Sequence, residues 1–428
     1  MKKIYLHTFG CPKNIADSEI LLHQIRLNDF EVVERVDVAD IVLINTCCFI
    51  QDAKEESLEY IFEMVKLKQA GIIKQIYVFG CLSERYTNEL KADIPEVDSF
   101  FGTYSTFNII QSLGGKPRKE ELHKRSLTTP SHYSYIKISD GCNHKCSFCA
   151  IPSFKGRYNS KKINEILKEI KNLPPTVKEI NLVAQDTTSY GRDIYKKFDL
   201  TYLLNKIDKS SFNGWIRLLY AYPIHFKKDI LNIMLDSNKF CSYLDIPIQH
   251  ISDVVLKSMR RGETKKIILD LIDYVRMKVP NIALRTSVIV GYPTEGKKEF
   301  DELVSFIEKA KFDRLGIFTY SAEEGTNAFK LSDSVSLKEK KRRKETLLEI
   351  QKDISYSNNL KYVGKKMKVL IDEEDSSSFF ARTEFDAPEI DNLVVINKKA
   401  GAKKKCGNFA EVKIIDSSDF DLYAEFSN

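Results

Sequence analysis

Short apolar segments alternate with amphipathic helical segments through most of this 428-residue chain, and this alternation constrains the fold more than any other feature. Such alternation predicts parallel sheets flanked by helices. The first region, which we place at residues 1–117, carries three candidate strands: Ile4–Phe9, Ile41–Ile44 and Ile76–Phe79. We therefore expect a small α/β domain with a parallel sheet at the N-terminal end.

The alternation resumes on a larger scale in residues 128–357, after a polar stretch with Gly114, Gly115 and Pro117 that is typical of a linker. Six candidate strands follow: Tyr135–Ile138, Glu179–Val183, Trp215–Leu219, Tyr243–Pro247, Ile282–Val290 and Arg314–Phe318. Six strand–helix units of this size predict an open (βα)6-type barrel. Functional residues of such barrels gather at the carboxyl ends of the strands.

Residues 358–428 differ in character from the rest of the chain. Short β segments are expected at Lys366–Ile371, Asn392–Ile396 and Glu411–Ile415, with polar turns between them. This pattern predicts a third domain, a small antiparallel β barrel.

The chain has nine cysteines and a net charge of +6. Its longest apolar run, Ala39–Ile50, is interrupted by polar residues and is too short to cross a bilayer, so no membrane partner is expected. No secretory signal is recognisable, which makes the cytoplasm the expected location. Because thiols stay reduced in that compartment, the cysteines indicate metal binding or catalysis rather than disulfides.

Cys142, Cys146 and Cys149 form a C-x-x-x-C-x-x-C loop directly after the first strand of the central region. Three thiolates can hold three irons of a 4Fe-4S cluster and leave the fourth iron open to a small molecule. The alternative is a zinc loop, which normally requires a fourth protein ligand. His144 lies inside the loop, on the wrong side for easy closure around zinc, so the cluster is the favoured interpretation.

A second set of cysteines follows strands of the N-terminal region. Cys11, Cys47 and Cys81 each come directly after one of the three candidate strands, and therefore at the same edge of a parallel sheet. The repeated placement favours a second three-cysteine cluster over three unrelated buried thiols. Cys48, Cys241 and Cys406 have no such context, and we expect them to be structural.

The cysteine loop, with Phe148 before its third cysteine, resembles the radical S-adenosylmethionine superfamily. Over its whole length the chain resembles the radical S-adenosylmethionine methylthiotransferases, which have an N-terminal three-cysteine domain, a radical barrel and a C-terminal TRAM domain. Within this family it is most similar to the enzymes that modify a ribosomal protein. The segments that carry this similarity are Gly10–Asn14, Ala184–Thr187, Asp245–His250, Ser321–Thr326, Arg382–Thr383 and Asp386–Glu389.

The resemblance implies a function and a set of cofactors. The expected reaction is methylthiolation of the β-carbon of an aspartate in small-subunit ribosomal protein twelve. Two 4Fe-4S clusters and S-adenosylmethionine would be required, with Cys142, Cys146 and Cys149 at the radical cluster and Cys11, Cys47 and Cys81 at the auxiliary one. A sulfur donor and an electron donor such as a flavodoxin or ferredoxin would be partners. Cys48 stands where relatives commonly have glycine.

Weaker signals mark further candidate residues for binding S-adenosylmethionine. Gln185 and Asp186 follow one barrel strand, and Gln249 follows another, at the end where such barrels build their sites. Gly291 closes a strand that resembles a cofactor-contacting strand of the superfamily. Phe148 is a candidate neighbour of the cofactor because of its place in the cysteine loop.

Two other functions compete with this interpretation: a transfer-RNA adenosine methylthiotransferase, and a non-enzymatic iron–sulfur or zinc protein that binds nucleic acid. Charge helps to choose between them. Residues 358–428 contain eleven Lys/Arg and thirteen Asp/Glu, a balance of −2, whereas the rest of the chain carries +8. An RNA-binding module should be basic, and an acidic one suits a basic ribosomal protein. Glu384, Asp386 and Glu389 are the expected contacts, and Lys398–Lys405 is a possible basic patch.

Overall fold

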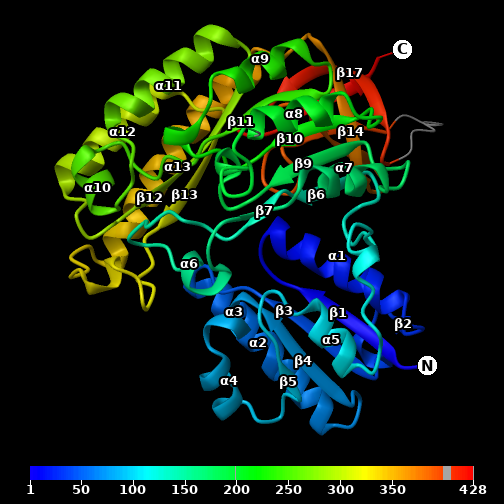
Figure 1. Cartoon of the computed structure of the whole chain (residues 1–428). Helices are drawn as coiled ribbons and strands as arrows, with labels where there is room; N and C mark the ends of the chain where they lie inside the picture. The colour runs from blue at the N-terminus through cyan, green and yellow to red at the C-terminus, as the bar shows by residue number, and fades with distance from the viewer. Residues whose placement is uncertain (198, 399–405, 428) are drawn as a thin grey trace.

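The computed structural model describes residues 1–197, 199–398 and 406–427, which form three regions (Figure 1). The N-terminal region lies below the central one in this view, and the C-terminal strands lie behind the right-hand part of the central sheet. Within the described ranges, no helix has both the length and the apolar character needed to cross a membrane.

The N-terminal region is a parallel sheet with helices on both faces, as predicted. Its strand order is β2-β1-β3-β4-β5. The strands are β1 (Lys3–Thr8), β2 (Glu31–Val32), β3 (Ile41–Thr46), β4 (Gln75–Gly80) and β5 (Ser99–Phe100). The helices are α1 (Pro12–Arg26), α2 (Gln51–Gln69), α3 (Cys81–Arg85), α4 (Thr87–Asp93) and α5 (Thr106–Ser112). Helices α1 and α5 share one apolar core with the sheet, and α2, α3 and α4 share the other, so β3 is buried along its whole length.

The central region is an open six-stranded parallel sheet of order β13-β12-β11-β10-β9-β6, which confirms the predicted (βα)6-type arrangement. Its strands are β6 (Tyr133–Lys137), β9 (Glu179–Val183), β10 (Trp215–Leu218), β11 (Phe240–Asp245), β12 (Ala283–Val290) and β13 (Arg314–Thr319). A small ribbon of β7 (Ser139–Asp140) and β8 (Asn159–Ser160) flanks the cysteine loop. The helices are α6 (Ile151–Lys155), α7 (Ile163–Lys171), α8 (Leu200–Asp208), α9 (Asp229–Asp236), α10 (Asp253–Ser258), α11 (Lys265–Lys278), α12 (Lys297–Ala310) and α13 (Leu337–Leu360).

The C-terminal region is a closed five-stranded barrel of order β14-β15-β16-β18-β17. Its strands are β14 (Lys366–Glu374), β15 (Ser378–Thr383), β16 (Val394–Asn397), β17 (Phe409–Ser417) and β18 (Leu422–Phe426). The expected barrel is confirmed, with one difference: β16 and β18 pair in parallel, whereas we predicted an antiparallel barrel. The Lys398–Lys405 patch lies outside the described residues except for Lys398.

Buried ion pairs join the C-terminal barrel to the inner face of the central sheet. The guanidinium of Arg382, on β15, lies 2.7 Å from Glu179 on β9 and 2.7 Å from Asp372 on β14. Asp386 pairs with Arg314 at the start of β13 and is 2% exposed. The side chains of the central strands alternate between apolar residues that face the helices and a mixture of charged and aromatic ones that face this second domain.

This interface corrects one expectation drawn from charge. Asp386 is buried, Glu384 accepts a hydrogen bond from the Ser242 amide at 3.0 Å, and Glu389 accepts one from the Tyr133 hydroxyl at 2.6 Å. These acids therefore contribute to the contact between the two domains. Asp386 is not accessible to a basic protein, whereas Glu389 is exposed, and the expected docking role of Glu384 and Glu389 stays a prediction. Part of the acidic surplus of this region is neutralised inside the molecule.

Candidate functional site

The structure brings the three N-terminal cysteines to one edge of the first sheet. Cys11, Cys47 and Cys81 follow β1, β3 and β4, which are adjacent parallel strands. Gly10 has φ +90°, and a Cβ atom there would lie 2.8 Å from the Cys47 sulfur. The Cys11 loop therefore approaches the Cys47 side chain so closely that only glycine fits at position 10.

Asn14, in the first turn of α1, links the three cysteine loops. Its side-chain nitrogen donates to the carbonyl oxygens of Phe9 at 2.9 Å and Thr46 at 3.2 Å. The Cys81 sulfur lies 3.8 Å from its side-chain oxygen. The sequence motif contains Asn14 but does not predict this role, because the Thr46 and Cys81 partners are far away in the chain.

Cys47 and Cys81 are buried, Cys11 is half-buried, and the three thiols lie near enough to change one another's pKa. Burial raises the pKa of Cys47, and the neighbouring Cys11 raises it further. Burial also raises the pKa of Cys81, with Cys11, Cys48 and Cys47 adding to the rise and the Lys155 ammonium opposing it. Ionising the Cys47 and Cys81 thiols therefore requires a nearby positive charge, which iron supplies when thiolates bind it.

The central cysteine triple lies between β7 and α6. The Cys142 amide donates to the Gly156 carbonyl at 3.1 Å, and the Cys149 amide donates to the Cys146 carbonyl at 3.2 Å. Burial raises the pKa of Cys142 to about 11 and that of Cys149 to about 12, and thiol charges within the loop contribute. Among described residues, no three His, Cys, Asp or Glu side chains are grouped so as to hold a metal ion. The cluster assignment of the six cysteines stays a prediction.

Arg261 lies near the cysteine loop and was not predicted from the sequence. Its buried guanidinium stacks 4.1 Å from the centre of the Tyr222 ring. Its positive charge offsets part of the rise that burial causes in the pKa of Cys142 and Cys149. It also donates to the Pro247 carbonyl at 2.7 Å and pairs with Glu263. No sequence pattern identified it, because a single arginine more than a hundred residues from the loop carries no spacing signal.

His144 is not directed toward closing a zinc site. Its Nε2 lies 2.7 Å from Asp186, and its ring stacks on Tyr222 with centroids 3.9 Å apart. Asp186 also accepts hydrogen bonds from the Thr188 amide and the Ser189 hydroxyl. These contacts fix the position of the cysteine loop, and they occupy both carboxylate oxygens of Asp186.

The other candidate residues all lie near the carboxyl ends of the barrel strands. Gln185 donates to Asp140 at 3.1 Å, while its own side-chain oxygen is buried without a partner. Gln249 has φ +70° and extends pairing beside β12 through its amide and carbonyl groups. Phe148 packs in a cluster that contains Tyr292. Gly291 has φ +74°, and a Cβ there would meet the Lys340 side chain at 2.3 Å.

The two cysteine triples lie on either side of the interface between the first two domains, and helix α6 connects the two sides. Helix α6, which directly follows Cys149, inserts Phe154 into the apolar core that contains Cys47 and Cys81. The Tyr104 hydroxyl donates to the Lys155 carbonyl at 2.8 Å, which fastens α6 to the N-terminal region. Figure 1 shows α6 beside α3, the helix that Cys81 begins.

Charged residues of both domains gather beside the N-terminal triple. Lys137 pairs with Asp17 and lies 2.6 Å from Asp140, and Lys155 lies 3.5 Å from Asp17. Burial would raise the pKa of Asp140, but Lys137 and Lys155 hold it well below its usual range. Burial would lower the pKa of Lys13, but Tyr220, Cys11 and Asp140 raise it instead. The barrel mouth is therefore a buried, ionised environment.

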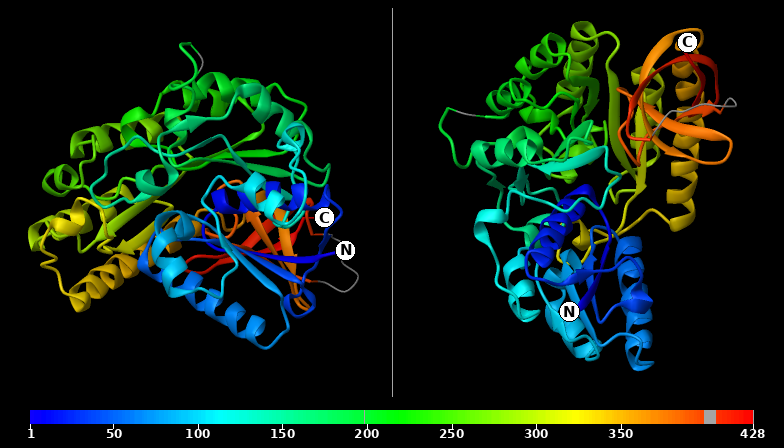
Figure 2. Two further views of the ribbon diagram at one scale, coloured as in Figure 1. Left: turned by 60° about the horizontal axis from the view of Figure 1, so that its bottom comes forward. Right: turned by 90° about the vertical axis from the view of Figure 1, so that its right-hand side faces the viewer.

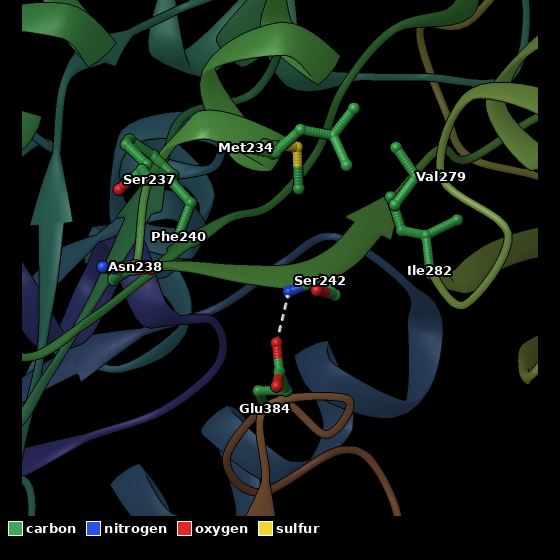
Figure 3. A pocket seen from close by; sticks show the side chains of 9 residues that line it. Met234, Ser237, Asn238, Phe240, Ser242, Val279, Ile282 and Glu384 are labelled. Carbon is green, nitrogen blue, oxygen red and sulfur yellow. Dashed lines mark hydrogen bonds between the residues drawn. The ribbon is translucent and has the colours of Figure 1, made fainter.

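A cavity of about 290 Å³ lies away from this site. It is lined by Met234, Leu235, Ser237, Asn238, Phe240, Ser242, Val279, Ile282 and Glu384. Figure 3 shows Glu384 reaching from the C-terminal region toward Ser242. Because Phe240 and Ser242 belong to the start of β11, the cavity is at the end of the barrel opposite to the cysteines, and it belongs to the domain interface.

Three family models match the chain. The uncharacterized protein family UPF0004 matches residues 3–102, the radical SAM superfamily residues 136–307, and the TRAM domain residues 363–426. Among solved structures, the cobalamin-dependent S-adenosylmethionine radical enzyme OxsB aligns with a TM-score of 0.52 at 11% identity. The alignment covers 83% of this chain and 56% of that one. This likeness concerns the fold.

Curated relatives are similar over nearly the full chain. A protein of Chloroherpeton thalassium named ribosomal protein uS12 methylthiotransferase RimO is 48% identical, with 98% of each chain covered. A protein of the same name from Bacteroides fragilis is 46% identical, with 99% of each chain covered. At this identity and coverage, the chain belongs to the ribosomal protein uS12 methylthiotransferase (RimO) family.

Proposed function

We propose that this chain adds a methylthio group to the β-carbon of an aspartate of ribosomal protein uS12, using S-adenosylmethionine and two 4Fe-4S clusters. The observation that carries the proposal is the insertion of α6 into the N-terminal core, because it places two separate cysteine triples on either side of one interface. A β C–H bond has no strongly acidic proton, so hydrogen abstraction by a radical is a chemically reasonable activation.

Each triple has a distinct task in this proposal. Cys142, Cys146 and Cys149 would hold the cluster that donates the electron for cleaving S-adenosylmethionine. Cys11, Cys47 and Cys81 would hold the cluster whose open iron keeps the sulfur near the substrate. The buried Arg261 and Lys155 lie near the two triples and offset part of the thiolate charge. Phe148, Gln185, Asp186, Gln249 and Gly291 remain proposed neighbours of S-adenosylmethionine.

The remaining parts of the proposal concern partners and boundaries. We assign the domains to residues 1–117, 128–357 and 358–428, and the place of action to the cytoplasm. A flavodoxin or ferredoxin would supply electrons, and a separate donor would supply sulfur. The substrate is uS12, free or within the ribosomal subunit.

The test is mass spectrometry of ribosomal proteins from a strain that lacks this chain. The strain is complemented with the wild-type chain, with Cys142, Cys146 and Cys149 all changed to alanine, or with Cys11, Cys47 and Cys81 all changed to alanine. We expect uS12 to carry the mass of one methylthio group on an aspartate only with the wild-type chain. In vitro, the second variant should retain cleavage of S-adenosylmethionine, and the first should lose it. Modified uS12 in the uncomplemented strain, with transfer RNA losing a methylthio group instead, would contradict the proposal.

A further inference from the structure

Lys13 is a buried cation that points from the N-terminal region into the barrel mouth. It lies in the first turn of α1, two residues after Cys11, and is 9% exposed. Its Nζ lies 3.8 Å from the centre of the Tyr220 ring. Tyr220 follows β10 directly, and its amide donates to Asp245, the last residue of β11, at 3.0 Å. Lys13 therefore reaches the carboxyl ends of the barrel strands, where (βα) barrels bind their substrates.

The carboxylates near Lys13 already have other partners. Asp140 lies 2.6 Å from Lys137 and 3.9 Å from Lys155, and it accepts from Gln185. Asp17 pairs with the same two lysines. In the described part of the chain, no carboxylate forms an ion pair with Lys13. Lys13 is thus the one of these three lysines that forms no ion pair with either aspartate, although Asp140 and Cys11 lie near enough to raise its pKa.

A buried ammonium without a directly bound carboxylate is costly, because burial removes water from the charge and distant groups replace only part of that hydration. Tyr220 supplies only the face of its ring, and a cation–π contact recovers part of the cost. The ammonium carries three donors, and those not directed at the ring remain available to an acceptor. Such a group at the mouth of a site is suited to bind an anion that enters with the substrate.

We propose that Lys13 binds the carboxylate of the substrate aspartate and thereby selects this side chain for modification. The inference rests on the proposed function, because it requires a substrate that carries a carboxylate. In aspartate the carboxylate is bonded to the reacting β-carbon. A cation that holds it would therefore place that carbon between Cys11 on one side and the barrel mouth on the other. Lys13 would be a substrate-binding and specificity-determining residue.

The experiment compares two substrates with four enzymes. The substrates are uS12 and uS12 with the target aspartate changed to asparagine, which keeps the shape and removes the charge. The enzymes are the wild type, Lys13→Met, Lys13→Arg and Lys66→Met. Lys66 is an exposed lysine in the last turn of α2, and its replacement is the matched control. Iron content and the visible spectrum of each reconstituted enzyme are measured beside the rate of methylthiolation.

We expect the wild type and Lys66→Met to favour aspartate strongly over asparagine. Lys13→Met should modify the aspartate substrate roughly tenfold to a hundredfold more slowly, as expected for loss of a hydrogen bond to a charged group. Its preference for aspartate over asparagine should shrink by a similar factor, with iron content unchanged. Lys13→Arg, which keeps the charge, should recover part of the preference.

Two results would overturn the inference while leaving the proposed function in place. One is an equal loss on both substrates in Lys13→Met, since a role in positioning alone would not change the preference. The other is loss of iron in Lys13→Met, which would make Lys13 a partner of the Cys11 thiolate. A wild-type enzyme that fails to modify uS12 at all would instead overturn the proposed function, and the inference with it.

Discussion

At the scale of single residues, the adjacent thiols of Cys47 and Cys48 have different surroundings. Cys47 lies directly against Gly10 in the loop that carries Cys11. Cys48 is fully buried, and burial raises its pKa to about 12 despite the nearby Arg85 guanidinium. The Arg85 side chain also donates to the Cys48 carbonyl at 3.4 Å. Cys47 therefore lies against the Cys11 loop. Cys48 is buried like a small apolar residue, although it too lies near enough to Cys81 to raise the pKa of that thiol.

This difference predicts opposite results for two alanine variants. Cys47→Ala should lose the auxiliary iron, about half of the total, because it removes one of three proposed ligands. Cys48→Ala should keep all the iron and lose about 1 kcal/mol of stability through the small cavity it leaves. Iron analysis and denaturant unfolding of both variants measure these effects. The opposite pattern, with iron lost only in Cys48→Ala, would identify Cys48 as the ligand.

At the scale of secondary-structure elements, the sequence predicted the strands that are apolar and missed those that are not. The central strands were found to within three residues at each end, because parallel strands under helices are continuous apolar runs. Strands β2, β5, β7 and β8 were missed because each has only two residues. Strands β15 and β18 were missed although they are partly apolar, because polar residues interrupt their apolar pattern. The cysteines were found from spacing and strand ends. Lys13, Asn14 and Arg261 acquired roles only through contacts made across long stretches of chain, which no local pattern records.

The charged residues inside the central strands form ion pairs with residues that are distant in the sequence. Glu179 and Arg217 pair at 2.9 Å with both side chains fully buried, in strands that otherwise face apolar helices. Arg382 completes this set from the C-terminal barrel, and His132 lies 2.7 Å from the same Asp372 that Arg382 contacts. On the face of the central sheet toward the neighbouring domain, these ion pairs lie among aromatic and apolar side chains such as Trp215 and Tyr243.

Arg382→Met should therefore destabilise the protein strongly. Removing the guanidinium leaves Glu179 and Asp372 with fewer partners in a dry interface, and such a loss typically costs about 3–5 kcal/mol. The measurement is the midpoint of denaturant unfolding. Arg35→Met is the control, because Arg35 pairs with Asp37 on the exposed surface and its loss should leave the midpoint unchanged. Equal midpoints for the two variants would show that the buried pair contributes no more than the surface pair.

At the scale of the whole molecule, the N-terminal and central regions lie side by side (Figure 2), and buried ion pairs join them. Glu323, in the loop after β13, lies 2.9 Å from Lys54 on α2 and 3.0 Å from Arg85 on α3. Arg85 also donates to the Glu324 carbonyl at 2.6 Å. Glu323 is 3% exposed, so these contacts are shielded from water and salt. The segment Ser321–Thr326 was singled out by resemblance alone, and here it acquires a physical role.

The contacts between the domains also determine what a deletion of the C-terminal barrel would measure. The C-terminal barrel supplies the counterions of Arg314 and Arg285 in the central sheet, through Asp386 and Asp391. Removing residues 358–428 would take away the carboxylate partner of Arg314 and one of the two carboxylate partners of Arg285, which would keep only Asp245. A truncated chain would therefore report on stability as well as on substrate binding, and point substitutions separate the two better.

Glu323→Gln tests whether the relative placement of the two domains matters for sulfur transfer. The amide keeps the size of the side chain but removes the charge that attracts Lys54 and Arg85, so the N-terminal region should hold less firmly to the barrel. Cleavage of S-adenosylmethionine depends on residues of the barrel alone and should continue. The yield of methylthiolated uS12 per S-adenosylmethionine cleaved should fall several-fold, because the sulfur is no longer held at a fixed distance from the radical. Glu324→Gln is the matched control, since the exposed Glu324 contributes only its carbonyl to Arg85. If both variants give the wild-type yield, the Glu323 contacts stabilise the domain interface without affecting sulfur transfer. Faster limited proteolysis between the domains of Glu323→Gln would then be the expected effect.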